Sequence, residues 1–147
     1  MNVVLASTRS DQRFALEVLL REQPGMDVVG TTTNTEGLLA LTETSRPVLL
    51  ILDWDLPGRP LEEVLVKAHS ADCRPYVIVL GKDETTRQAA LSAGADAFVL
   101  RGDSPRFLLE AIQQARSHTK TATEQQTPSS VRQATAADQT STKSKGE

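Results

Sequence analysis

The chain is 147 residues long, a length typical of one domain, and it contains a single cysteine, Cys73. One cysteine excludes an intrachain disulfide and a metal site built from clustered cysteines. The formal net charge of −3 argues against binding to nucleic acid through its phosphate backbone. The first residues enter a short apolar run without a basic flank. We therefore expect no secretory signal, no membrane span and a cytoplasmic location.

Short apolar runs alternate with segments of helical spacing along most of the chain. In chain order, the predicted elements are a strand at Val3–Ala6, a helix at Phe14–Leu20, a strand at Met26–Gly30, a helix at Asn34–Thr44, a strand at Val48–Asp53, a helix at Leu61–Ala68, a strand at Tyr76–Leu80, a helix at Ala89–Ala93, a strand at Ala97–Leu100 and a helix at Phe107–Ala115. Within the third strand, Val48–Leu52 shows no apolar–polar alternation, which is typical of a strand buried on both faces.

This order of elements predicts an α/β fold with a parallel sheet covered by helices on both faces. Five strands with short connections favour the flavodoxin-like (βα)5 doubly wound topology, strand order 2-1-3-4-5. Its switch point lies between the first and third strands. Ser7 and Thr8 follow the first strand and Asp53 ends the third, so we expect these residues to meet there.

The composition changes at His118. Residues 118–147 contain seven Thr, four Ser and four Gln but almost no large apolar side chain. Such a segment cannot bury enough apolar surface to offset its ordering entropy. The sequence therefore predicts a folded domain at residues 1–117 and a disordered Thr/Ser/Gln-rich tail at residues 118–147.

Two motifs, Val48–Gly58 and Ala93–Arg101, resemble the acceptor strand and the turn into the fifth strand of bacterial response-regulator receiver domains. The resemblance covers about residues 2–117. It implies that Asp53 accepts a phosphoryl group from a histidine kinase or a phosphotransfer protein. It also implies that Phe98 is the switch aromatic and that the chain is not an enzyme. The expected function is a stand-alone receiver-like signalling protein of a two-component phosphorelay.

The resemblance also shows where the expected pocket departs from the family. Receiver domains are described as holding Mg²⁺ with an acidic pair after the first strand and a main-chain carbonyl two residues after the acceptor. Here Ser7 and Thr8 stand at the acidic pair and Asp55 at the carbonyl position. Gly81 replaces a hydroxyl residue and Arg101 replaces a lysine. Mg²⁺ prefers hard anionic oxygens, so we expect only weak Mg²⁺ binding and slow or absent phosphorylation.

Several of these residues have other interpretations. Thr8 and Asp11 fit a variant capping box, with Thr8 as the N-cap of the first helix. Arg9 is expected in solvent, although it is close enough in sequence to neutralise Asp53. Arg101 is expected to pair with Asp53 as a permanent salt bridge, which would hold the site in one state.

The sequence leaves two other functions open. One is a pseudo-receiver that binds partners independently of phosphorylation. The other is a phosphatase of the haloacid-dehalogenase type, since Asp53-Trp54-Asp55 resembles its nucleophile and acid pair. Pro57 and the lack of a second acidic residue beside Asp103 argue against it.

The expected contact surface is the one that receiver domains usually employ, formed by the fourth helix, fifth strand and fifth helix. Here it would include Thr85–Ala93 and Ser104–Ala115. The tail has no basic cluster and no apolar periodicity, so we expect no nucleic-acid partner and an output through another protein or a homodimer.

Overall fold

Strands and helices alternate strictly in the computed structural model of the chain, which describes residues 1–70 and 74–126. The strands are β1 (Asn2–Ala6), β2 (Asp27–Thr32), β3 (Leu49–Asp53), β4 (Tyr76–Gly81) and β5 (Ala97–Leu100). The helices are α1 (Ser10–Arg21), α2 (Thr35–Ser45), α3 (Leu61–His69), α4 (Glu84–Ala93) and α5 (Pro105–Gln126). The predicted order of elements is confirmed.

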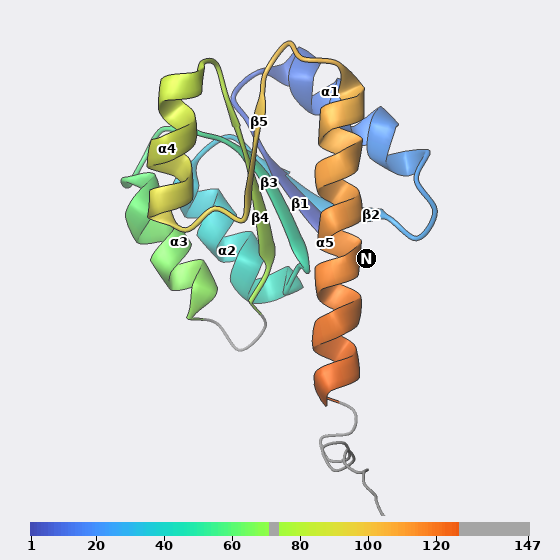
Figure 1. Cartoon of the computed structure of the whole chain (residues 1–147). Coiled ribbons are helices and arrows are strands. Elements are labelled where there is room, and N and C mark those ends of the chain that lie inside the picture. The colour runs from blue at the N-terminus through green and yellow to red at the C-terminus, as the bar shows by residue number, and fades with distance from the viewer. Residues whose placement is uncertain (71–73, 127–147) are drawn as a thin grey trace, which may run out of the picture. The chain divides into compact units, whose positions relative to one another are not determined.

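The five strands form one parallel sheet in the order β2-β1-β3-β4-β5. Helices α2, α3 and α4 cover one side of this sheet, and α1 and the start of α5 cover the other (Figure 1). The fold is therefore the predicted flavodoxin-like doubly wound sheet. Its switch point lies between β1 and β3, which pair directly.

The central strands are buried on both faces, which explains the absence of alternation in their sequence. Successive residues of a strand point to opposite faces. On one face, side chains of β1, β3 and β4 pack with α2 and α3 in the core cluster: Val4, Ala6, Leu50, Leu52, Val77, Val79, Leu38, Leu61, Val64 and Leu65. The side chains between them along the strands are fully buried as well: Val3, Leu5, Leu49, Ile51 and Ile78.

The first helix begins at Ser10, one residue later than a Thr8 N-cap would require. Arg9 is the N-cap of α1 and makes no capping bond with its side chain, so the prediction of Thr8 as N-cap is wrong. Ser7 Oγ instead accepts a hydrogen bond of 3.1 Å from the backbone N–H of Arg9. Asp11 does lie in the first turn, as predicted. Asn34 is the N-cap of α2, and Gly94 follows α4 in the left-handed conformation, while α4 begins at Glu84, earlier than predicted.

The last helix continues beyond the predicted start of the tail. It runs to Gln126, past the predicted start of the tail at residue 118, while residues 127–147 lie outside the described part of the chain. Extending an existing helix needs no new nucleation, and Lys, Ala, Glu and Gln in this stretch favour helix. The chain divides into two units, Met1–Ile112 and Gln113–Glu147. No described helix is long and apolar enough to cross a membrane.

Candidate functional site

The carboxyl ends of the strands bring four of the predicted site residues to one edge of the sheet. Asp53 is the last residue of β3 and is only 1% exposed. Ser7 follows β1, Gly81 ends β4, and Arg101 follows β5. Because all five strands are parallel, these positions lie at the same edge, where open α/β sheets place their sites.

Ser7 is bonded directly to the Asp53 carboxylate. Its hydroxyl donates a hydrogen bond of 2.6 Å to Asp53 Oδ2 within the buried interior. Ser7 Oγ in turn accepts hydrogen bonds from the Gln12 side-chain amide at 3.1 Å and from the Arg9 backbone N–H at 3.1 Å. These two donors fix the orientation of the hydroxyl, so that its proton points at the carboxylate.

Gln12 is a site residue that the sequence reading missed. Its Nε2 donates a hydrogen bond of 2.7 Å to Asp53 Oδ1, the oxygen that Ser7 does not contact. Arg13, the next residue of α1, donates from Nη1 to the backbone carbonyl of Ser7 at 2.7 Å and so ties the helix to this loop. The sequence feature that could have pointed to Gln12 is its position in the first turns of the helix that follows β1.

Arg101 supplies the positive charge at this site. Its Nη1 lies 3.9 Å from Asp53 Oδ2, which agrees with the predicted ion pair. Its Nη2 donates to Asp55 Oδ2 at 3.3 Å. The Arg101 side chain is 14% exposed, whereas that of Asp55 is 59% exposed. Both distances exceed the 2.7–2.9 Å typical of strong charge-assisted bonds, so Arg101 holds the two carboxylates loosely.

Two of the predicted pocket residues lie elsewhere. Thr8 and Arg9 are exposed, and among the described residues neither is bonded to Asp53 through its side chain. The solvated position expected for Arg9 is the one observed. Trp54 is half-buried and packs against the core cluster beside Asp53.

The position of Gly81 is closed by Phe98. A Cβ atom built on Gly81 would lie 2.5 Å and 2.6 Å from two ring carbons of Phe98. The ring is 7% exposed, belongs to the core cluster and lies 4.9 Å from the guanidinium carbon of Arg87. An aromatic ring therefore occupies the space into which a side chain at residue 81 would project.

The groups around Asp53 do not fit a Mg²⁺ site. A hydroxyl, a carboxamide NH₂ and a guanidinium all direct hydrogens or positive charge at the carboxylate. Mg²⁺ requires oxygen ligands in octahedral geometry. Within residues 1–70 and 74–126, no group of three or more His, Cys, Asp or Glu side chains could hold a metal ion.

Comparison with known proteins identifies the class of this fold and site. The chain matches the response regulator receiver domain family over residues 3–113 and belongs to that family. Receiver domains generally bind Mg²⁺ at their phosphorylation site and interact with histidine kinases or phosphotransfer proteins. They are generally non-enzymatic.

The chain is 30% identical over 118 residues to the nitrate/nitrite response regulator protein NarL of Escherichia coli K12, covering 79% of this chain and 55% of that protein. It thus spans about half the length of the curated relatives it matches. A LuxR-family DNA-binding response regulator of Staphylococcus aureus superposes with a TM-score of 0.69 at 25% identity, over 78% of this chain and 97% of that chain. The response regulatory domain of Klebsiella pneumoniae mrkE shares the fold, with a TM-score of 0.74 at 13% identity over 82% and 99% of the two chains.

Proposed function

We propose that this receiver domain signals through protein contacts in its unphosphorylated state, and that its acceptor, Asp53, reacts only slowly. The observation that carries this proposal is the Asp53 cradle, which we define as Ser7, Gln12 and Arg101. Gln12 occupies Oδ1, while Ser7 and Arg101 occupy Oδ2. Both oxygens of the carboxylate are therefore engaged before any phosphodonor arrives.

Phosphoryl transfer to Asp53 requires a carboxylate oxygen with a free lone pair in line with the phosphorus atom. Each carboxylate oxygen keeps a second lone pair, but turning an oxygen toward the phosphorus moves Asp53 out of the cradle and breaks at least one cradle bond. A hydrogen bond to a charged group contributes about 1.5–3 kcal/mol. Adding that energy to the barrier slows the reaction roughly tenfold to hundredfold. The cradle therefore acts as an internal competitor of the phosphodonor.

The transition state also lacks the usual neutralising groups. Negative charge develops on the equatorial oxygens of the transferred group, and metal ions and cations normally stabilise it. In this chain Ser7 and Thr8 stand where the acidic pair is expected, Ser7 donates to Asp53, and Gly81 offers no hydroxyl. Arg101 is the one cation of the cradle, and it already faces Asp53 and Asp55. We therefore propose that Mg²⁺ binds weakly here and accelerates the reaction little.

The proposed contact surface is the face of α4, β5 and the start of α5. Each of the two helices exposes a large apolar side chain, since Leu91 and Phe107 are both 43% exposed. Exposed apolar residues among polar neighbours are typical of protein-binding surfaces. The partner is proposed to be another protein or a second copy of this chain.

A phosphodonor assay tests the proposal. Acetyl phosphate is added to the wild-type chain with and without Mg²⁺, and modification is followed on a phosphate-affinity gel, with Asp53→Asn as the blank. We expect slow labelling that Mg²⁺ barely changes. The double variant Ser7→Asp/Thr8→Asp restores an acidic pair and is expected to react at least tenfold faster, and only with Mg²⁺. Ser10→Asp, at an exposed position of α1, is the matched control.

One observation favours a second candidate, a receiver switched by phosphate. Arg101 places a cation beside the carboxylate, where a phosphoryl group would sit. Fast, stoichiometric, Mg²⁺-dependent labelling of wild-type Asp53 would establish this candidate and overturn the first. Half-buried Trp54 gives an independent readout, because a saturable fluorescence change on adding beryllofluoride is expected only for the switched receiver.

A further inference from the structure

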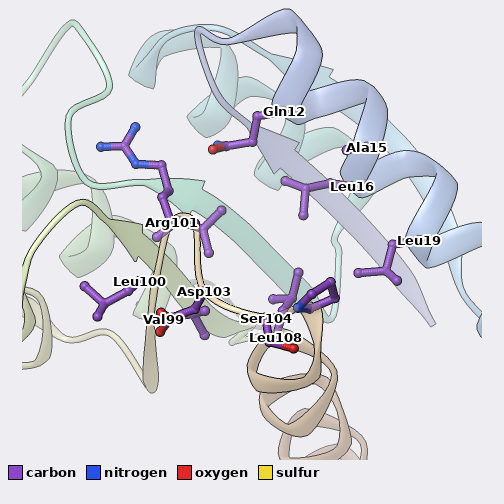
Figure 2. A pocket seen from close by; sticks show the side chains of 13 residues that line it. Gln12, Ala15, Leu16, Leu19, Val99, Leu100, Arg101, Asp103, Ser104 and Leu108 are labelled. Atoms are coloured by element: carbon purple, nitrogen blue, oxygen red, sulfur yellow. The ribbon is translucent and has the colours of Figure 1, made fainter.

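A cavity of about 300 Å³ lies between α1 and the segment that joins β5 to α5. Its walls are largely apolar and include Leu16, Leu19, Val99 and Leu108 (Figure 2). This volume lies at the lower end of small-molecule pockets. The cavity is therefore of a size that suits a small ligand.

One end of the cavity is polar and is shared with the Asp53 cradle. Gln12 and Arg101 both line the cavity, and both contact Asp53. Figure 2 shows the Gln12 side chain extending from α1 toward the side where Arg101 lies. The two residues couple an otherwise apolar cavity to the buried carboxylate.

These two side chains retain unused hydrogen-bonding capacity. Gln12 donates through Nε2 to Ser7 and Asp53, while its Oε1 accepts no hydrogen bond from any residue that the structure describes. The guanidinium of Arg101 carries five N–H donors, and its one hydrogen bond to a described residue is that to Asp55. The end of the cavity thus offers one acceptor and several donors.

The charges at this end select against ionic ligands. The carboxylates of Asp53 and Asp55 both lie beside Arg101, which is the cation among the cavity-lining residues. An anionic head group would add to this excess of negative charge. An ammonium head group would face the Arg101 guanidinium and could accept no hydrogen bond from it. A neutral head group avoids both penalties.

We propose that this cavity binds a neutral amphipathic small molecule with a carboxamide head and a short apolar tail. The carbonyl oxygen of the ligand accepts from Arg101, and its N–H donates to Gln12 Oε1. The tail lies among Leu16, Leu19 and Leu108, where burial of apolar surface supplies the affinity. Because Gln12 and Arg101 also hold Asp53, occupancy of the cavity and release of the carboxylate influence each other reciprocally.

An NMR titration of the full chain tests this proposal with three matched probes: hexanamide, hexanoate and hexylamine. Hexanamide is expected to give saturable shifts of backbone amide signals in α1 and in residues 99–108, with a dissociation constant of about 1 mM. The two ionic probes are expected to bind at least tenfold more weakly. No saturable shift with hexanamide, or equal binding of all three probes, would overturn the proposal.

A pair of variants locates the binding. Ala15 is exposed and lines the cavity, whereas Ala89 is exposed on α4 and does not line it. Ala15→Leu is expected to weaken hexanamide binding at least tenfold by filling the cavity, and Ala89→Leu is expected to leave it unchanged. Both replacements retain a good helix former, and circular dichroism verifies that the variants fold. Unchanged binding by Ala15→Leu would show that the probe binds elsewhere.

Discussion

Gln12 Nε2 donates a hydrogen bond of 2.7 Å to Asp53 Oδ1 and thereby joins the first turns of α1 to the end of β3. The two residues are 41 positions apart in the sequence. In a family that generally binds Mg²⁺ at this edge of the sheet, a neutral amide here satisfies an oxygen of the carboxylate. The side chains of Ser7, Gln12 and Arg101 thus all engage the negatively charged carboxylate of Asp53.

Replacing Gln12 with leucine tests the energetic weight of this bond. Gln12→Leu keeps a side chain of similar size but leaves Asp53 Oδ1 without its donor. We expect the free energy of unfolding in urea to fall by about 1.5 kcal/mol, the lower end of the range for a hydrogen bond to a charged group. Gln88→Leu, at an exposed position of α4, is the control. It is expected to change the free energy of unfolding by less than about 0.5 kcal/mol. Equal effects of the two variants would mean that the amide bond contributes no stability.

Arg101 is expected to stabilise the fold through its charge and through its shape. Arg101→Met leaves the buried Asp53 carboxylate without a cation, and we expect a loss of about 3 kcal/mol, the lower end for a broken buried pair, because Ser7 and Gln12 remain bonded. Arg101→Lys keeps the charge but loses the planar fork, for an expected loss of about 1 kcal/mol. Denaturation in urea measures the free energy of unfolding of both variants and checks these two expected losses.

Asp55 provides the control for Arg101. Its side chain is 59% exposed, so its ion pair is screened by water. Asp55→Asn is expected to lower the free energy of unfolding by less than about 1 kcal/mol. A loss as large as that of Arg101→Met would show that Asp55, and not Asp53, is the main partner of the guanidinium.

Adding a side chain at Gly81 should strain the core because Phe98 fills the space. In Gly81→Ser, the new Cβ would lie within 2.6 Å of the Phe98 ring. We expect a loss of about 1–3 kcal/mol, typical of overpacking. In a Phe98→Ala background the same change should be nearly neutral, so a double-mutant cycle should give a coupling energy of at least about 1 kcal/mol. Additive losses would rule out a steric conflict between the two positions.

His69 is expected to make the free energy of unfolding depend on pH. Burial lowers its pKa from the ordinary value of 6.5, nearby Arg74 lowers it further, and Asp96 opposes the shift. The unfolded chain therefore takes up a proton near pH 6.5 that the folded chain resists. It follows that the free energy of unfolding falls as the pH drops below about 6.5. Urea denaturation between pH 7.5 and 5.5 should show this decline, and it should be smaller in His69→Gln. An identical slope in both proteins would contradict the assignment.

The local pattern of apolar residues in the sequence was sufficient to predict the order of strands and helices. The apolar run before Asp53 predicts a strand buried on both faces, and β3 is buried throughout. The fifth strand was predicted with the bounds that it has, and Gly94 ends α4 as its freedom at positive φ suggests. These features depend on the spacing of apolar residues and on single-residue backbone preferences, both of which are encoded locally.

The local sequence was not sufficient to predict all the side chains that contact Asp53. Ser7 was predicted from its position after the first strand and Arg101 from the resemblance to receiver domains. Gln12 was not predicted, because nothing in a helical sequence marks which polar side chain turns inward. Thr8 looked like a helix cap, yet α1 begins at Ser10 and its N-cap is Arg9. A bond across 41 residues exists only once the sheet has aligned β1 with β3 and set α1 above their ends. Hydrogen bonds act over about 3 Å, so the packing of elements, and not the order of residues, decided how this carboxylate is held.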